Sequence, residues 1–174
     1  AAMKLTSASR IAMVGLKEED VDKVWADLGM SPGAAVGLCV RSIKACPGTT
    51  FCKRGIQDSL SLGMKLDGIY HGMQVPNKFK IGVSGCPNQC AETCIKDLGF
   101  VGTAKGWKVL VGGNGGPKPR LSEELARDLS DEKAMELADK VIEYYKANGK
   151  LGKRLGAMID EQGGIEKFRA AVLE

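Results

Sequence analysis

Two cysteine pairs constrain the fold of this chain more than any other feature of its sequence. The segment "CPGTTFC" places five residues between Cys46 and Cys52, and "CPNQC" places three between Cys86 and Cys90. Each pair starts with Cys-Pro directly after an apolar run, and the nearby glycines and prolines favour turns over the interior of a helix or strand. We therefore expect each pair in a loop that follows a strand.

Four kinds of chemistry use neighbouring cysteines: a disulfide, a zinc site, a redox thiol pair and an iron-sulfur cluster. Residues 1–10 lack the apolar core of a signal peptide, and no apolar run reaches about 18 residues. We therefore expect a cytoplasmic protein without a membrane span, and disulfides are rare in that compartment. Structural zinc often uses histidine, of which the chain has one, and a thioredoxin-like pair needs a different spacing. The iron-sulfur interpretation accounts for both spacings and for the turn residues.

The chain is mildly basic, with 25 Lys and Arg residues against 21 Asp and Glu residues, and aromatic residues make up only 5%. Proteins that bind nucleic acids concentrate more basic charge on one face and often add aromatic side chains for stacking. The composition therefore argues against a nucleic-acid partner and favours local attraction of a small anion.

The first part of the chain reads as strand, helix, strand. Residues 9–16 predict a strand, residues 18–29 an amphipathic helix that stops at Gly29, and residues 34–45 a second strand. Cys46 follows that strand directly. A helix predicted over residues 49–70 would place Cys52 near its N-terminus, where backbone amides stabilise negative charge.

The second cysteine pair repeats the arrangement. Residues 79–85 predict a strand that ends at Cys86, and two further strands are expected over residues 97–102 and 107–113. Open α/β sheets build their sites at the ends of strands, so both pairs are expected at such a site.

The last part of the chain consists of helix-forming residues. A helix is predicted to start after Ser130 and end at Gly149, and two short helices are expected over residues 151–173, broken at Gly163 and Gly164. The packing stripe of the long helix is predicted to be Ala134, Leu137, Ala138, Val141, Ile142 and Tyr145.

Three segments together resemble the sirohaem and [4Fe-4S] domain of the assimilatory nitrite and sulfite reductase family: "RSIKACPGTTFCKRGIQDSLSLG", "PNKFKIGVSGCPNQCAETCIKDLGFVG" and "GWKVLVGGNGG". The resemblance is closest to the sirohaem region of the NADH-dependent nitrite reductases. The fold it implies is α+β. Residues 1–45 would form a ferredoxin-like half domain (strand-helix-strand), residues 46–120 an α/β sirohaem and [4Fe-4S] domain, and residues 121–174 a helical C-terminal tail.

The resemblance also implies which cysteines are ligands. The family's four cluster ligands match Cys46, Cys52, Cys86 and Cys90. Cys90 matches the ligand whose thiolate also bridges to the sirohaem iron. The remaining two cysteines, Cys39 and Cys94, lie outside the motifs and are expected to be ordinary small buried residues.

Basic residues and a glycine-rich loop complete the implied site, because sirohaem carries carboxylates and its substrate is an oxyanion. The family's catalytic basic positions match Arg10, Arg41, Lys78 and Lys80. The cofactor contacts are expected from Cys90, Lys44, Gly112, Gly113, Asn114, Lys118 and Arg120. An ordinary alternative is that Lys78 and Lys80 are solvated charges beside a strand end, and that His71 lies on a helix surface.

The implied function is a sirohaem- and [4Fe-4S]-dependent reductase that converts sulfite to sulfide or nitrite to ammonia. Full members of the family contain two copies of this unit, and this sequence contains one, so we expect a homodimer. Electrons would come from a ferredoxin-like or flavin-containing donor. The alternatives are a cluster protein for electron transfer without catalytic sirohaem, and a sirohaem carrier.

Overall fold

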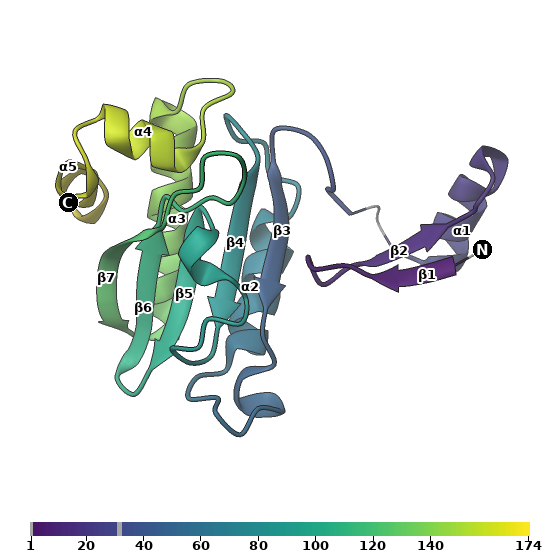
Figure 1. Cartoon of the computed structure of the whole chain (residues 1–174), viewed down its shortest axis with the longest axis horizontal. Coiled ribbons are helices and arrows are strands. Elements are labelled where there is room, and N and C mark those ends of the chain that lie inside the picture. The colour runs from purple at the N-terminus through teal and green to yellow at the C-terminus, as the bar shows by residue number, and fades with distance from the viewer. Residues whose placement is uncertain (1, 31–32) are drawn as a thin grey trace.

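A five-stranded sheet forms the centre of the protein in the computed structural model, which describes residues 2–30 and 33–174 (Figure 1). The strand order is β3-β4-β5-β6-β7; the first three strands are parallel, and β6 and β7 are antiparallel to their neighbours. The strands are β3 (Val40–Ala45), β4 (Phe79–Ser84), β5 (Leu98–Thr103), β6 (Gly106–Val111) and β7 (Glu123–Leu129). Parallel neighbours need a crossover connection, and α2 (Ser59–Tyr70) lies in the one between β3 and β4.

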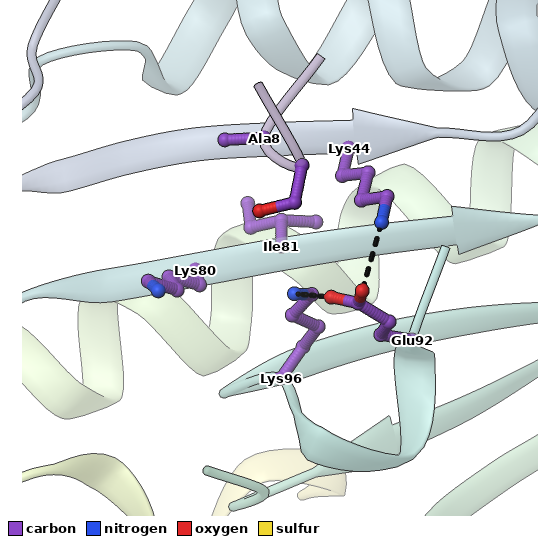
Figure 2. A pocket seen from close by; sticks show the side chains of 7 residues that line it. Ala8, Lys44, Lys80, Ile81, Glu92 and Lys96 are labelled. Atoms are coloured by element: carbon purple, nitrogen blue, oxygen red, sulfur yellow. Dashed lines mark hydrogen bonds and ion pairs between the residues drawn. The ribbon is translucent and has the colours of Figure 1, made fainter. Parts of the chain in front are cut away.

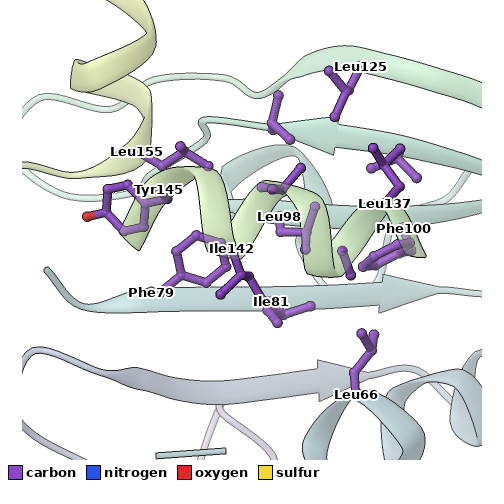
Figure 3. Close-up of a cluster of buried hydrophobic side chains, with 14 of the residues drawn as sticks. Leu66, Phe79, Ile81, Leu98, Phe100, Leu125, Leu137, Ile142, Tyr145 and Leu155 are labelled. Carbon is purple, nitrogen blue, oxygen red and sulfur yellow. The ribbon is translucent and has the colours of Figure 1, made fainter. Parts of the chain in front are cut away.

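One face of the sheet packs against helices and holds the core. Along β4, Phe79, Ile81 and Val83 are fully buried, and they alternate with residues that face the other side. The helix α3 (Asp131–Asn148) covers this face with the six residues that the sequence predicts, so the predicted stripe is confirmed. Figure 3 shows side chains of α3 interleaved with those of β4 and β5, and Leu66 of α2 beside them.

The N-terminal arm is a separate antiparallel hairpin followed by a helix. Its strands are β1 (Ala2–Leu5) and β2 (Ile11–Val14), and the 3-10 turn η1 (Glu18–Asp20) leads into α1 (Val21–Leu28). The predicted helix is confirmed, and it ends at Gly29, whose φ of 60° is the left-handed conformation that favours glycine. The arm projects away from the sheet (Figure 1).

Two expectations for the first half of the chain are wrong. The predicted strand over residues 34–45 begins only at Val40, and it pairs with β4 in the central sheet. The predicted helix over residues 49–70 begins only at Ser59, so Cys52 does not lie near a helix N-terminus. Asp58 starts the helix, because its carboxylate accepts a hydrogen bond from the Ser61 amide at 3.1 Å.

The C-terminal residues form two short helices, as expected, and contain one element that the sequence did not predict. The helices are α4 (Leu155–Glu161) and α5 (Ile165–Leu173), and α5 packs against α3 and β7. The strand β7 precedes α3, where the sequence offers Glu, Leu, Ala and Arg. These residues favour helices in isolation, so pairing with β6 overrides the local preference. Across residues 2–30 and 33–174, none of the helices combines the length and apolar character needed to cross a bilayer.

Candidate functional site

The two cysteine motifs lie together because β3 and β4 are parallel neighbours. Ala45 is in register with Val83, so both strands reach the same edge of the sheet before their cysteines. The Cys46 amide donates to the Val83 carbonyl at 3.0 Å, and the Gly85 amide donates to the Cys46 sulfur at 3.2 Å. The prediction that both motifs follow strand ends is confirmed.

Glycines allow the two motif loops to approach at backbone distance. A Cβ placed on Gly85 would lie 2.6 Å from the Gln57 carbonyl oxygen and 2.9 Å from the Gly48 Cα. The absence of a side chain lets the amides of Ile56 and Gln57 both donate to the Gly85 carbonyl, at 2.8 and 3.0 Å. A β-carbon at Gly102 would meet the same carbonyl oxygen at 2.6 Å. This close packing fixes the base of both cysteine loops on the sheet edge.

The four motif cysteines differ in exposure. Cys86 is buried, Cys46 is half-buried, and Cys52 and Cys90 are exposed. Within the described part of the chain, no three Cys, His, Asp or Glu side chains converge at metal-binding distance. The chemistry of the donor set nevertheless fits an iron-sulfur cluster, because thiolates are its usual ligands and the Gly85 amide already donates to the Cys46 sulfur.

A pocket of about 70 Å³ lies beside this edge, on the sheet face opposite the helices (Figure 2). Lys80 reaches it from β4, where it alternates with the buried Phe79 and Ile81. Lys44 reaches it from β3, two residues before Cys46. The full lining is Ser7, Ala8, Lys44, Lys80, Ile81, Glu92 and Lys96.

Glu92 binds two lysines in this pocket. Its Oε1 accepts a hydrogen bond from Lys44 Nζ at 3.0 Å, and its Oε2 accepts one from Lys96 Nζ at 2.8 Å (Figure 2). Hydrogen bonds from Lys96 and Lys44 lower the pKa of Glu92 to about 2. Burial is the main cause that lowers the pKa of Lys80, and the charges of Lys96 and Arg154 add to it.

Sequence reasoning predicted Lys44 and Lys80 but missed Glu92 and Lys96. Their position in the sequence could have identified them, because both lie between the second cysteine pair and the strand β5 and are four residues apart. Lys96 is only 8% exposed, which is unusual for a lysine and requires a partner of opposite charge.

A buried ion pair adjoins the pocket through the backbone of Lys80. Asp97 is fully buried and accepts hydrogen bonds from Arg154 Nε at 2.8 Å and from the Lys80 amide at 2.8 Å. The second carboxylate contact, from the Arg154 terminal nitrogen, measures 2.5 Å. Because Arg154 lies at the start of α4, this pair fixes the helix to the strand that carries Lys80.

The other predicted catalytic residues lie outside the pocket lining. Arg10 donates to the Ala34 carbonyl at 3.2 Å, and Arg41 donates to the Gly37 carbonyl at 2.9 Å. Lys78 is half-buried just before β4 and lies close enough to Lys80 to help lower its pKa. Their roles in a catalytic site stay predictions.

The glycine-rich loop after β6 packs largely against the protein itself. A Cβ on Gly113 would lie 2.7 Å from the Lys96 carbonyl oxygen, and one on Gly112 would lie 2.7 Å from the Arg120 guanidinium. Asn114 and Arg120 exchange two backbone hydrogen bonds at 2.9 Å that close the loop, and Lys118 is exposed. The Arg120 side chain pairs with Asp160 at 2.8 Å and also with Glu123. Arg120 therefore ties this loop to α4 in the described structure.

Comparison with known proteins identifies relatives along almost the whole chain. Residues 36–174 match the family model described as "Nitrite and sulphite reductase 4Fe-4S domain". The chain is 46% identical over 172 residues to an assimilatory-type sulfite reductase of Nitratidesulfovibrio vulgaris, covering 98% of this chain and 78% of that protein. It is 36% identical over 175 residues to the nitrite reductase (NADH) large subunit of Escherichia coli, covering 98% of this chain but only 21% of that protein.

Two solved structures share the fold. The Mycobacterium tuberculosis NirA protein aligns with a TM-score of 0.82 at 21% identity, over 98% of this chain and 34% of that one. A dissimilatory sulfite reductase I aligns with a TM-score of 0.86 at 15% identity, over 98% of this chain and 61% of that one. The α+β architecture expected from the sequence is thus the architecture that both of these structures share with this chain.

Proposed function

Because the chain belongs to the nitrite and sulphite reductase 4Fe-4S domain family, we propose that it reduces a small oxyanion, either sulfite to sulfide or nitrite to ammonia. Each conversion takes six electrons, which a separate ferredoxin-like or flavin-containing protein in the cytoplasm would supply. One observation carries the proposal: Lys44 and Lys80 line an anion-sized pocket on the strands that lead directly into the two cysteine motifs.

The proposed cofactors are a [4Fe-4S] cluster and sirohaem. Cys46, Cys52, Cys86 and Cys90 would hold the cluster, and Cys90 would link it to the sirohaem iron. When bound, the coupled pair supplies single electrons to a ligand on the haem iron. The protein's own contribution is electrostatic, because the pocket lysines stabilise negative charge that develops as oxygen leaves and can donate protons to it.

The pocket is a small recess of about 70 Å³, and its charged lining of three lysines and one carboxylate suits an anionic group better than the apolar face of a macrocycle. A small oxyanion or a single carboxyl group fits it, so the sirohaem ring itself would lie against the exposed cysteine edge. This placement requires a second protein surface to cover the ring, which supports a dimer.

The proposed activity is tested on protein that is purified without oxygen from cells grown with added iron and sulfide. We expect a haem Soret band together with cluster absorption, and sulfide or ammonia formation when reduced viologen supplies electrons. A cluster shoulder without a haem band, with neither product formed, would instead assign the protein to electron transfer. A haem spectrum without either product would assign it to cofactor carriage.

We also propose a homodimer, with the N-terminal arm at its interface. Leu5 pairs directly with Ile11 across the hairpin and Met3 with Met13, so one hairpin face consists of four apolar side chains. Met3 and Leu5 are each 79% exposed and Ile11 is 63% exposed. A contiguous apolar face of this kind is a characteristic protein interaction surface. Two such faces, one from each copy, would cover each other.

The double substitution Leu5→Asp with Ile11→Asp is expected to convert the dimer to a monomer, because two carboxylates from each copy would have to be buried at the interface. Sedimentation velocity measures the change, and product formation should fall with the dimer fraction. Leu151→Asp is the matched control, since Leu151 is equally exposed but lies in the loop after α3. A native protein that is monomeric and still reduces its substrate would contradict the dimer.

A further inference from the structure

The lysine pocket carries an excess of positive charge that the protein itself only partly compensates. Three of its lining residues are lysines and one is a carboxylate, Glu92. The lysines are poorly hydrated: the side chain of Lys44 is 18% exposed and that of Lys96 is 10% exposed. Poorly hydrated ammonium groups need anionic partners, because burial of an unpaired charge is costly.

Glu92 occupies its position in a strained backbone conformation. Its φ of 59° and ψ of 37° lie in the left-handed region, which costs a non-glycine residue on the order of 1 kcal/mol. This conformation places the Glu92 side chain between two lysines that come from opposite sides of the pocket (Figure 2). Strained backbone conformations cluster at functional sites, so the conformation of Glu92 beside a charged pocket points to a functional role.

We propose that Glu92 is an internal competitor for an anion site, whose carboxylate bridges Lys44 and Lys96 until an incoming anionic group with two oxygens displaces it. The identity of that group rests on the proposed function: it is either the oxyanion substrate or a carboxylate of the cofactor. Both present two oxygens that can accept from both ammonium groups, as the Glu92 carboxylate does. Chloride is a single atom, so it cannot offer the two separate acceptor atoms that the Glu92 carboxylate presents.

The structure provides both the route and the space for the exchange. The Glu92 side chain is 44% exposed, so it can swing into solvent without crossing the core. The strand segment that carries Lys80 stays in place, because the Lys80 backbone amide donates to the buried Asp97 carboxylate at 2.8 Å. Displacement would replace the Glu92 bridge with a bridge through two oxygens of the incoming anion, and Lys80, which also lines the pocket, would add a third positive charge.

The test compares Glu92→Gln with the native protein by isothermal titration calorimetry of the purified protein. The probes are sodium sulfite and uroporphyrin, an iron-free tetrapyrrole rich in carboxylates, with sodium chloride as a monoatomic comparison. Glutamine keeps the size of the side chain but lacks its charge, so we expect it to tighten binding of one probe about tenfold, equivalent to about 1.4 kcal/mol. Tighter sulfite binding assigns the site to the substrate, and tighter uroporphyrin binding assigns it to the cofactor carboxylates.

Three further variants make the result specific. Glu92→Gly removes both the carboxylate and the backbone strain, so it should tighten binding at least as much and it covers the case in which the Gln variant folds poorly. Lys96→Met in the Glu92→Gln background should abolish the gain. Glu161→Gln removes a carboxylate that pairs with Lys153 and Lys150 elsewhere, and it should leave both affinities unchanged.

Unchanged or weaker binding of both probes in both Glu92 variants would overturn the proposal and make Glu92 a residue that positions the lysines for the ligand. This outcome is separate from a failure of the proposed function. A protein that forms neither sulfide nor ammonia but binds sulfite more tightly after Glu92→Gln would retain the anion site and lose the reductase assignment.

Discussion

Cys90→Ala is expected to reduce sulfite or nitrite turnover by roughly a thousandfold or more, to the background of the assay. The proposed electron path passes from the cluster to the haem iron through this thiolate, and the protein offers no substitute because the redox chemistry belongs to the cofactors. The substitution should also remove a cluster ligand, so iron and acid-labile sulfide content should fall in the same samples. Activity with reduced viologen and the visible spectrum are the two measurements.

Cys94→Ala is the matched control for this variant. Cys94 lies four residues further along, in the 3-10 turn η3 (Thr93–Ile95), and is half-buried outside both motifs. The Cys94→Ala protein should keep the native iron content, visible spectrum and turnover. Because Cys90 is exposed, its loss should leave the thermal stability of the protein without cofactors nearly unchanged. A Cys90→Ala protein with native spectrum and turnover would refute the assignment of Cys90 as the link to the haem.

Asp97→Ala is expected to lower the free energy of unfolding by about 3–5 kcal/mol, because it leaves the poorly exposed Arg154 without its partner. It also deprives the Lys80 amide of its hydrogen-bond acceptor. Urea denaturation of the purified protein measures the change. Glu124→Gln is the control, because it removes an exposed pair with Arg127 and should cost less than about 1 kcal/mol.

Substitution of Arg154, the partner of Asp97, is expected to change how the stability of the protein depends on pH. Burial raises the pKa of Asp97, and Arg154 opposes that increase. Without Arg154, in an Arg154→Met variant, the carboxyl group should take up a proton in the folded state. A folded-state pKa above the unfolded value means that stability is lost as pH rises. The loss of unfolding free energy caused by Arg154→Met should therefore be larger at neutral pH than near pH 5. A destabilisation independent of pH would show that Arg154 acts through packing alone.

The parts of the fold that the sequence predicted are those encoded by residues close together in the chain. The stripe of α3 repeats every three to four residues and is capped by Ser130, whose hydroxyl accepts from the Lys133 amide at 3.3 Å. The turn residues around both cysteine pairs likewise act locally. These signals need no knowledge of the partner strand, so the positions of the long helix and of the cysteine loops follow from them directly.

The sequence by itself determined the cysteine motifs, their positions after strands and the helical C-terminal part. Only the tertiary structure decided that β3 pairs with β4, that residues 123–129 form a strand, and that Glu92 joins Lys44 to Lys96. The physical reason is separation along the chain: Lys44 and Glu92 are 48 residues apart, and Asp97 and Arg154 are 57 apart. A charge pattern with a period of three to four residues reports on one helix, whereas ion pairs between distant segments exist only once the sheet has brought their strands together.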